Sequence, residues 1–151
     1  MNINIEKIPS YRIAFIRKVG PYGTGNIQTM EKLKNWSDSN KLLNNQSIIF
    51  GIAQDNPEET RPEDCRYDVC IVVSNEFCIN DDLVKQGNII GGQYAIFKIS
   101  HTAEAVKKVW TEIFPELINQ GYQYDKTKPI LERYSSEMVN NHYCEICVPI
   151  Y

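Results

Sequence analysis

One order of predicted elements occurs twice along this chain, and this duplication constrains the fold more than any other sequence feature. In the first half, a strand over residues 11–19 ends at Gly20-Pro21, and a helix from about Thr24 to Asn40 precedes strands over 47–53 and 66–73. In the second half, a strand over 91–99 is followed by a helix and by strands over 129–134 and 142–149. The pattern predicts two βαββ halves, about residues 1–80 and 81–151, in one domain of 151 residues.

Short matched segments support the duplication at residue level. The sequence IAFIR at 13–17 resembles YAIFK at 94–98, and YDVCIV at 67–72 resembles YCEICV at 143–148. Hairpins with an inserted helix indicate an α+β fold with a curved antiparallel sheet and two main helices. Two such halves around a pseudo-twofold axis leave a central groove, a usual place for a ligand.

The two helices carry apolar stripes at helical spacing. In the first, the stripe consists of Ile27, Met30, Leu33 and Trp36. In the second, Thr102 is a good N-cap, and the stripe comprises Val106, Val109, Trp110, Ile113, Phe114, Leu117 and Ile118. Pro115 lies inside this second stripe and predicts a kink or a broken last turn near Phe114.

Composition excludes several classes of function. The net charge is −3 and no cluster of Lys and Arg is present, so direct binding to nucleic acid is not expected. The N-terminus lacks a signal-peptide core and no apolar run is long enough for a membrane span, which predicts a cytoplasmic protein. No P-loop or Gly-rich dinucleotide turn occurs, and we expect no cofactor.

Five cysteines, Cys65, Cys70, Cys78, Cys144 and Cys147, are an odd number and indicate reduced thiols. Cys144 and Cys147 have the spacing of a metal or redox pair. They lie in a β-prone run, however, where residues three apart point to opposite faces. We therefore predict small buried side chains here and no metal site.

Glu132 is the sharpest candidate for a functional residue. In a strand, Ile130, Glu132 and Tyr134 share one face, which sets a carboxylate between an aliphatic and an aromatic neighbour. Burial without a partner would raise the pKa of this group. The alternative is an exposed glutamate on a polar sheet face.

The aromatic residues are the second candidate feature. Nine Tyr, five Phe and two Trp suit a pocket for flat or cationic molecules, although most aromatics serve as ordinary core. Trp110 and Phe114 stand four apart on the second helix and fit either role. Asp68 is read as an edge or turn carboxylate, and neither His101 nor His142 has the neighbours of a metal ligand or a catalytic base.

Four segments together resemble the GyrI-like small-molecule-binding family, whose domain also serves as the effector-binding module of AraC-type and MerR-type regulators. They are Ala14–Tyr22 with its Gly-Pro-Tyr turn, Phe50–Pro57 with Cys65–Cys70, Trp110–Tyr122, and Pro129–Tyr134 with Glu145–Pro149. No helix-turn-helix precedes or follows them, so the chain resembles the standalone members. This departure counts against a direct role as a transcription factor.

The resemblance implies that Glu132 lies in the groove and attracts cationic aromatic ligands, ringed by tyrosine and tryptophan side chains. Alignment of the two halves makes Gly51 the counterpart of Glu132, which predicts one acidic wall and one open wall. The expected ligand-binding residues are Glu132, Tyr134, Trp110, Phe114, Tyr67 and Gly51.

Three functions follow as hypotheses. The first is a protein that binds hydrophobic, often cationic, small molecules, for sequestration of a toxin or for sensing. The second is a hydrolase of reactive electrophiles, in which Glu132 activates water with Tyr67 or Tyr134 as the acid. The third, from the resemblance to gyrase inhibitors, is a protein that acts on a partner such as gyrase or a regulator.

Overall fold

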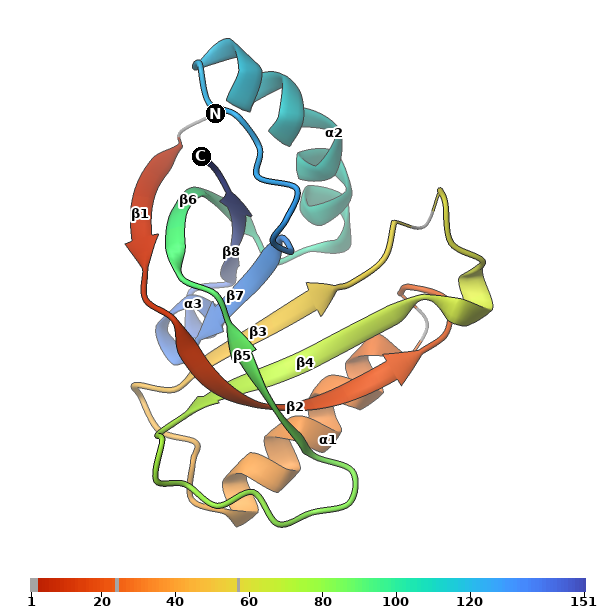
Figure 1. Cartoon of the computed structure of the whole chain (residues 1–151), viewed down its shortest axis with the longest axis vertical. Coiled ribbons are helices and arrows are strands. Elements are labelled where there is room, and N and C mark those ends of the chain that lie inside the picture. The colour runs from red at the N-terminus through yellow and green to blue at the C-terminus, as the bar shows by residue number, and fades with distance from the viewer. Residues whose placement is uncertain (1–2, 24, 57) are drawn as a thin grey trace.

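The chain folds into one eight-stranded antiparallel sheet with two main helices (Figure 1). The computed structural model describes residues 3–23, 25–56 and 58–151. The described elements are β1 Asn4–Ile8, β2 Tyr11–Val19, α1 Asn26–Ser39, β3 Ile48–Ala53, the 3-10 turn η1 Pro62–Asp64, β4 Arg66–Val73, β5 Lys85–Ile89, β6 Gly92–Ser100, α2 Ala103–Asn119, β7 Leu131–Ser135, α3 Ser136–Asn140 and β8 Tyr143–Pro149. The predicted α+β class is confirmed.

The order of strands in the sheet is a palindrome of the two halves. It runs β1-β6-β8-β7-β3-β4-β2-β5, so β3 and β7 meet at the centre. Corresponding strands of the two halves, such as β4 and β8, stand at equal distances on either side of this centre. The edge strands are exchanged, because β1 pairs with β6 and β5 pairs with β2. Each half is therefore ββαββ. Strands β1 and β5 were not predicted, because their polar residues at 4, 6 and 7 and at 85, 86 and 88 give no clear strand pattern.

The pseudo-twofold axis passes between Gly51 and Glu132. These two residues are direct partners in the β3–β7 register, as expected for counterparts that meet on an axis. The sequence alignment of the two halves was therefore right at this position.

The register corrects that alignment elsewhere. Cys70 pairs with Phe15 and Phe50, and Cys147 pairs in the same way with Ile96 and Leu131, which makes the two cysteines counterparts. The counterpart of Tyr67 is then Cys144, whereas the sequence comparison matched Tyr67 to Tyr143. A slip of one residue moves a side chain to the other face of a sheet, so this error matters for the site.

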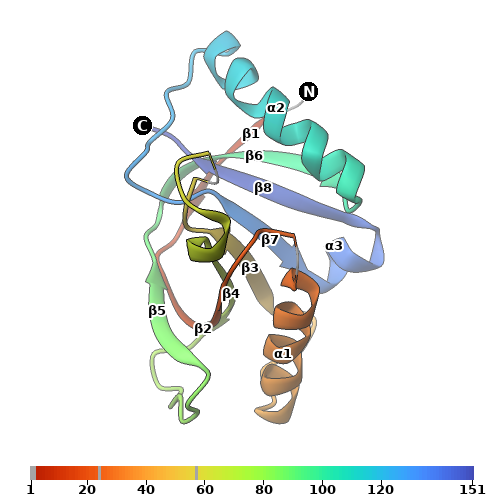
Figure 2. The ribbon, with the colours of Figure 1, turned by 90° about the vertical axis from the view of Figure 1, so that its right-hand side faces the viewer.

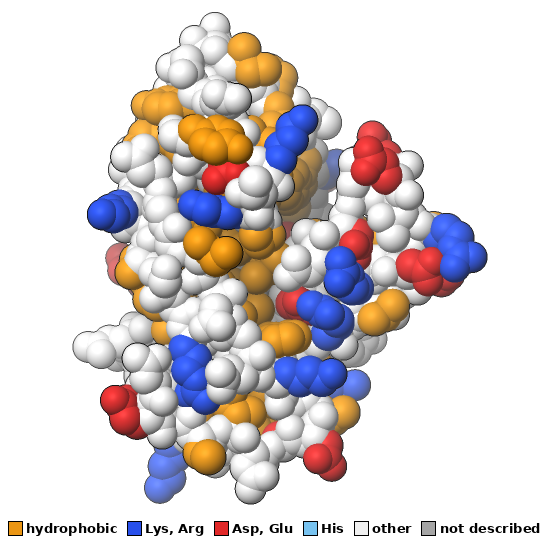
Figure 3. Space-filling model, in the orientation of Figure 1, with side chains coloured by type: hydrophobic (Ala, Val, Ile, Leu, Met, Phe, Trp, Pro, Cys, Tyr) orange, Lys and Arg blue, Asp and Glu red, His pale blue; other side chains and the backbone are white. Residues whose placement is uncertain are grey.

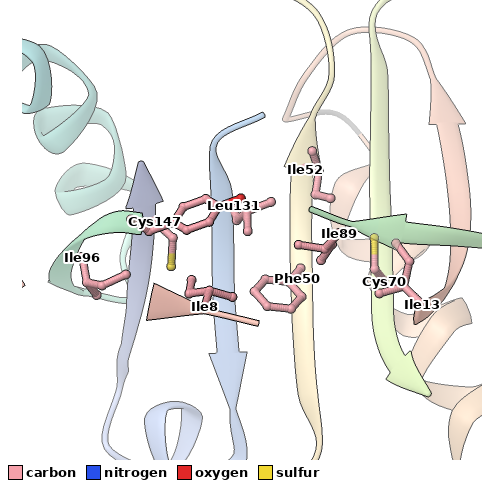
Figure 4. Close-up of a cluster of buried hydrophobic side chains, with 10 residues drawn as sticks. Ile8, Ile13, Phe50, Ile52, Cys70, Ile89, Ile96, Leu131 and Cys147 are labelled. Carbon is pink, nitrogen blue, oxygen red and sulfur yellow. The ribbon is translucent and has the colours of Figure 1, made fainter. Parts of the chain in front are cut away.

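The two faces of the sheet bury different side chains. Both main helices cover the same face, α1 over β2 and β4 and α2 over β6 and β8 (Figure 2). The opposite, concave face is filled by a third cluster that includes Phe50, Leu131, Cys70 and Cys147 (Figure 4). Each of these two helices covers one half of the sheet, so neither covers the middle of this face, over β3 and β7.

The helices differ from prediction at particular residues. The start at Thr24 lies outside the described residues, and α1 begins after Gly25, whose positive φ of 79° suits glycine. Ile27 was placed in the buried stripe but is 77% exposed. Thr102 caps α2 as predicted, by accepting a hydrogen bond from the Ala105 N–H. The helix continues through Pro115 to Asn119, so the last turn is not broken.

Candidate functional site

Two cavities flank the middle of the helical face. The larger, of about 820 Å³, lies toward α2 and contains Glu132, and we call it the acidic lobe; its main side chains are Tyr22, Tyr67, Trp110, Phe114, Tyr124 and Glu132. The smaller, of about 580 Å³, lies between α1 and α3, and we call it the α3 lobe; its main side chains are Ile27, Met30, Ile49, His101, Tyr134 and Val139. Tyr67 borders both lobes. In Figure 3 the surface is hollowed between α2 and the projecting segment after β3, with hydrophobic side chains in the hollow.

Glu132 is held in place by two tyrosine hydroxyls. Tyr67 donates a hydrogen bond to Glu132 Oε2 at 3.1 Å, and Tyr134 donates to the same oxygen at 2.9 Å. Within the described part of the chain, no Lys or Arg forms an ion pair with Glu132, and Oε1 accepts no hydrogen bond. The carboxylate is therefore oriented by neutral donors and has no ion-pair partner among the described residues, although Lys126 and Lys128 also line the lobe.

The surroundings shift the protonation of all three groups. Desolvation raises the pKa of Glu132 above its ordinary value, and the hydrogen bonds from Tyr134 and Tyr67 oppose this rise without cancelling it. Burial, together with the nearby Glu132 charge, raises the pKa of both Tyr67 and Tyr134 well above the usual value of a phenol. Both tyrosines therefore keep their protons at neutral pH and remain hydrogen-bond donors.

Gly51 makes room for this arrangement. A Cβ atom at Gly51 would overlap the Tyr67 hydroxyl and lie 3.2 Å from Glu132 Oε2. The expected open wall at Gly51 is wrong, because the Tyr67 phenol occupies that space. Gly51 lines neither lobe, and its role is to leave room for the side chains of Tyr67 and Glu132.

Aromatic rings line the acidic lobe together with Glu132. Trp110 and Phe114 reach it from α2, and Phe114 packs edge-on against Tyr124 at 5.3 Å between ring centroids. Tyr22 packs at 6.4 Å from Tyr67, and its hydroxyl bonds the backbone of Asp55. The structure thus brings Glu132, Tyr67, Trp110 and Phe114 to one lobe, while Tyr134 contributes its hydroxyl to Glu132 and its ring to the α3 lobe.

Sequence reasoning missed three aromatic residues of this region. Tyr22 was noted only in its Gly-Pro-Tyr turn, and Tyr124 was not singled out, since neither lies in a periodic element. His101 lacked the sequence neighbours of a ligand or a base and was assigned no role in a pocket, yet its ring lies 5.2 Å from that of Tyr134 and borders the α3 lobe. Tyr22, His101 and Tyr124 lie in the connections after β2, after β6 and before β7, and only the folded structure shows that they border the two lobes.

The remaining candidates lie elsewhere. Asp68 was read as an edge or turn carboxylate, but β4 is an inner strand, and Asp68 is buried in a bidentate pair with Arg17. Cys144 and Cys147 are free and buried, and burial raises the pKa of each thiol to about 12. No cluster of metal-ligating side chains is found in the ranges that the structure describes.

The comparison with protein families decides the classification. The family described as the GyrI-like small molecule binding domain matches residues 1–151. The chain belongs to the GyrI-like family. The resemblance inferred from the sequence is thereby confirmed, and the chain is a small-molecule-binding domain of this family.

Relatives within the GyrI-like family are named as regulators and inhibitors. The chain is 43% identical over 99% of both chains to the "SPbeta prophage-derived putative transcriptional regulator YosT" of Bacillus subtilis strain 168. It is 27% identical to the DNA gyrase inhibitor of Escherichia coli K12, over 97% of this chain and 93% of the relative.

Solved structures share the GyrI-like fold at low identity. The EcmrR C-terminal domain matches with a TM-score of 0.78 and 14% identity, over 99% of this chain and 97% of the domain. This chain spans 57% of the longer EcmrR chain in its complex with DNA. SAV2435 bound to tetraphenylphosphonium matches with a TM-score of 0.60 and 15% identity, over 100% and 94%. A hydrolase from Listeria innocua matches with a TM-score of 0.68 and 9% identity, over 99% and 91%.

The helices of this GyrI-like chain do not resemble membrane spans. Among the described residues, none is both long and apolar enough to cross a bilayer.

Proposed function

We propose that this protein binds lipophilic aromatic cations in the acidic lobe, with Glu132 as the counter-ion. The observation that carries the proposal is a partly buried carboxylate that lies among aromatic rings and has no Lys or Arg partner in the described residues. A cation among these rings would gain both charge compensation and cation–π contacts.

The size of the lobe agrees with a drug-sized ligand. Its volume of about 820 Å³ falls within the usual range for small-molecule sites. Trp110 and Phe114 would supply ring surface, while Tyr67 and Tyr134 hold Glu132 Oε2 and leave Oε1 for the ligand. The structural relative SAV2435, bound to tetraphenylphosphonium, is consistent with a ligand of this class.

Titration with tetraphenylphosphonium, followed by calorimetry, tests the proposal. Glu132→Gln keeps the shape of the side chain and an oxygen acceptor but removes the charge, and we expect binding to weaken about 30-fold, or about 2 kcal/mol. Glu58→Gln removes an exposed charge from the rim of the same lobe, and we expect a change of less than about twofold, since exposed charges are screened. Equal effects of the two variants, or undiminished binding to Glu132→Gln, would contradict a counter-ion role.

Hydrolysis is the second candidate, favoured by two observations. The raised pKa of Glu132 suits a general base, and among the described residues none donates a hydrogen bond to its Oε1 that would compete with a water molecule. The raised pKa values of Tyr67 and Tyr134 make each tyrosine a poor acid, which weighs against the second half of such a mechanism. Turnover of a strained electrophile such as an epoxide, lost in Glu132→Gln while product-like ligands still bind, would favour hydrolysis over binding alone.

A role on a protein partner rests on the relatives. The E. coli relative is named a DNA gyrase inhibitor and aligns with nearly the whole chain. Supercoiling by purified gyrase in the presence of this protein is the direct test, and an unaffected reaction would exclude gyrase as the target.

A further inference from the structure

We propose that the α3 lobe is a second binding site, which takes a neutral, flat aromatic molecule. The lobe is separate from the Glu132 side chain, which does not line it, and its volume of about 580 Å³ suffices for two or three fused rings. The proposal does not depend on what the acidic lobe binds.

The duplication shows why a second site exists. The axis between Gly51 and Glu132 relates Ile49, in the floor of the α3 lobe, to Ile130, in the floor of the acidic lobe. The α3 lobe is lined by α1 residues such as Met30, and the acidic lobe by α2 residues such as Trp110. The two lobes are therefore corresponding places in the two halves, each built from one helix, the central strands and the loop that precedes β3 or β7.

The surface of the α3 lobe is apolar and aromatic. Met30 and Ile49 form its aliphatic wall, and Tyr134 and His101, whose ring centroids lie 5.2 Å apart, form the aromatic wall. The hydroxyls of Tyr67 and Tyr134 are already bonded to Glu132, so both residues offer ring carbons to a ligand in this lobe. Val139 of α3 is 40% exposed and lies at the edge of the lobe.

The charges of the α3 lobe favour a neutral ligand. Glu132 places a carboxylate in the second half, whereas its counterpart in the first half, Gly51, has no side chain. Glu31 and Lys34, which border the lobe, have side chains of opposite formal charge and stand one turn apart on α1, so together they add no net charge to its lining. A neutral ring system would lose little solvation and would cover apolar surface.

Fluorescence titration with N-phenyl-1-naphthylamine, a neutral probe that brightens in apolar surroundings, tests this assignment. We expect saturable binding that excess tetraphenylphosphonium does not displace. Val139→Trp places a large side chain at the edge of the α3 lobe and should weaken probe binding at least about tenfold. The matched control is Ile118→Trp, which adds the same side chain at an exposed aliphatic position of α2 outside both lobes.

A further variant keeps the test decisive. Asn45→Trp changes an exposed loop residue at the α3 lobe and should also weaken the probe if Val139→Trp fails to fold. Displacement of the probe by tetraphenylphosphonium, absence of saturable binding, or equal affinity in the folded lobe variants and Ile118→Trp would each overturn the proposal.

Discussion

The acidic lobe and the α3 lobe are corresponding regions of a duplicated fold, yet they differ in charge. Both lie beside a main helix and over the centre of the sheet, on either side of the Gly51–Glu132 pair. At the pseudo-twofold axis, the second half has the carboxylate of Glu132 and the first half has Gly51, which has no side chain. The duplication thus supplies two similar frames, and one pair of residues on the axis makes them chemically different.

The pair on the axis cannot be symmetric. Two glutamates directly opposite each other on neighbouring strands would repel and would raise each other's pKa. A glutamate at position 51 would also displace the Tyr67 hydroxyl that orients Glu132. Gly51 is therefore as much a part of the carboxylate's environment as the two tyrosines are.

Among changes to the Gly51–Glu132 pair, Gly51→Ala is expected to have the largest effect, which is a loss of stability. The added methyl group would push Tyr67 away from Glu132, and we expect a loss of about 2 kcal/mol in the free energy of unfolding, as for other overpacked sites. Urea denaturation measures this loss.

A double-mutant cycle identifies the cause of that loss. Tyr67→Phe removes the hydroxyl that the new methyl group meets, so Gly51→Ala should cost about 1 kcal/mol less in the Tyr67→Phe background. Strictly additive losses would show that Tyr67 does not cover Gly51.

The two tryptophans offer an intermediate comparison, because each main helix carries one. Trp110→Leu removes ring surface from the acidic lobe and should weaken tetraphenylphosphonium binding about fivefold, or about 1 kcal/mol. Trp36→Leu removes a ring that packs against Phe77, outside both lobes, and should leave binding within about twofold. Both variants are compared as folded proteins by calorimetry, and a larger effect from Trp36→Leu would place the ligand elsewhere.

The smallest effect concerns stability and pH. Since the pKa of Glu132 is raised in the folded protein, the unfolded chain ionises first, and stability falls as the pH rises above 4.5 through the pKa of the folded state. Glu132→Gln avoids this loss and should raise the Tm of the ligand-free protein at pH 7 by about 2 °C. Near pH 4 the difference should vanish, and a Tm that is lower in the variant at pH 7 would contradict the sign of the shift.

The sequence predicted the parts of the fold that have strong periodicity. The inner strands, both main helices, the Thr102 cap and the correspondence of Gly51 with Glu132 follow from local patterns. The edge strands β1 and β5 do not, because each is stabilised by pairing with the other half and has a weak pattern of its own. Strand exchange between halves is a tertiary property that no local window contains.

The site was predicted in its residues more than in its geometry. The period of a strand placed Glu132 and Tyr134 on one face, and the family resemblance indicated a groove. The meeting of Tyr67 and Tyr134 at one oxygen of Glu132, however, depends on the β4 register, which the comparison of the two halves had placed one residue off. For the same reason, the sequence left the space above Gly51 open where the structure places a phenol.

The proposed binding of cations depends on Glu132 as a carboxylate without an ion-pair partner among the described residues, which a cation neutralises. The most direct measurement is the carboxyl carbon chemical shift of Glu132, followed by NMR across pH with and without tetraphenylphosphonium. We predict a pKa above 4.5 in the free protein and a lower pKa in the complex, because the cation favours the ionised form. A Glu132 pKa that tetraphenylphosphonium leaves unchanged under saturating conditions would contradict the account.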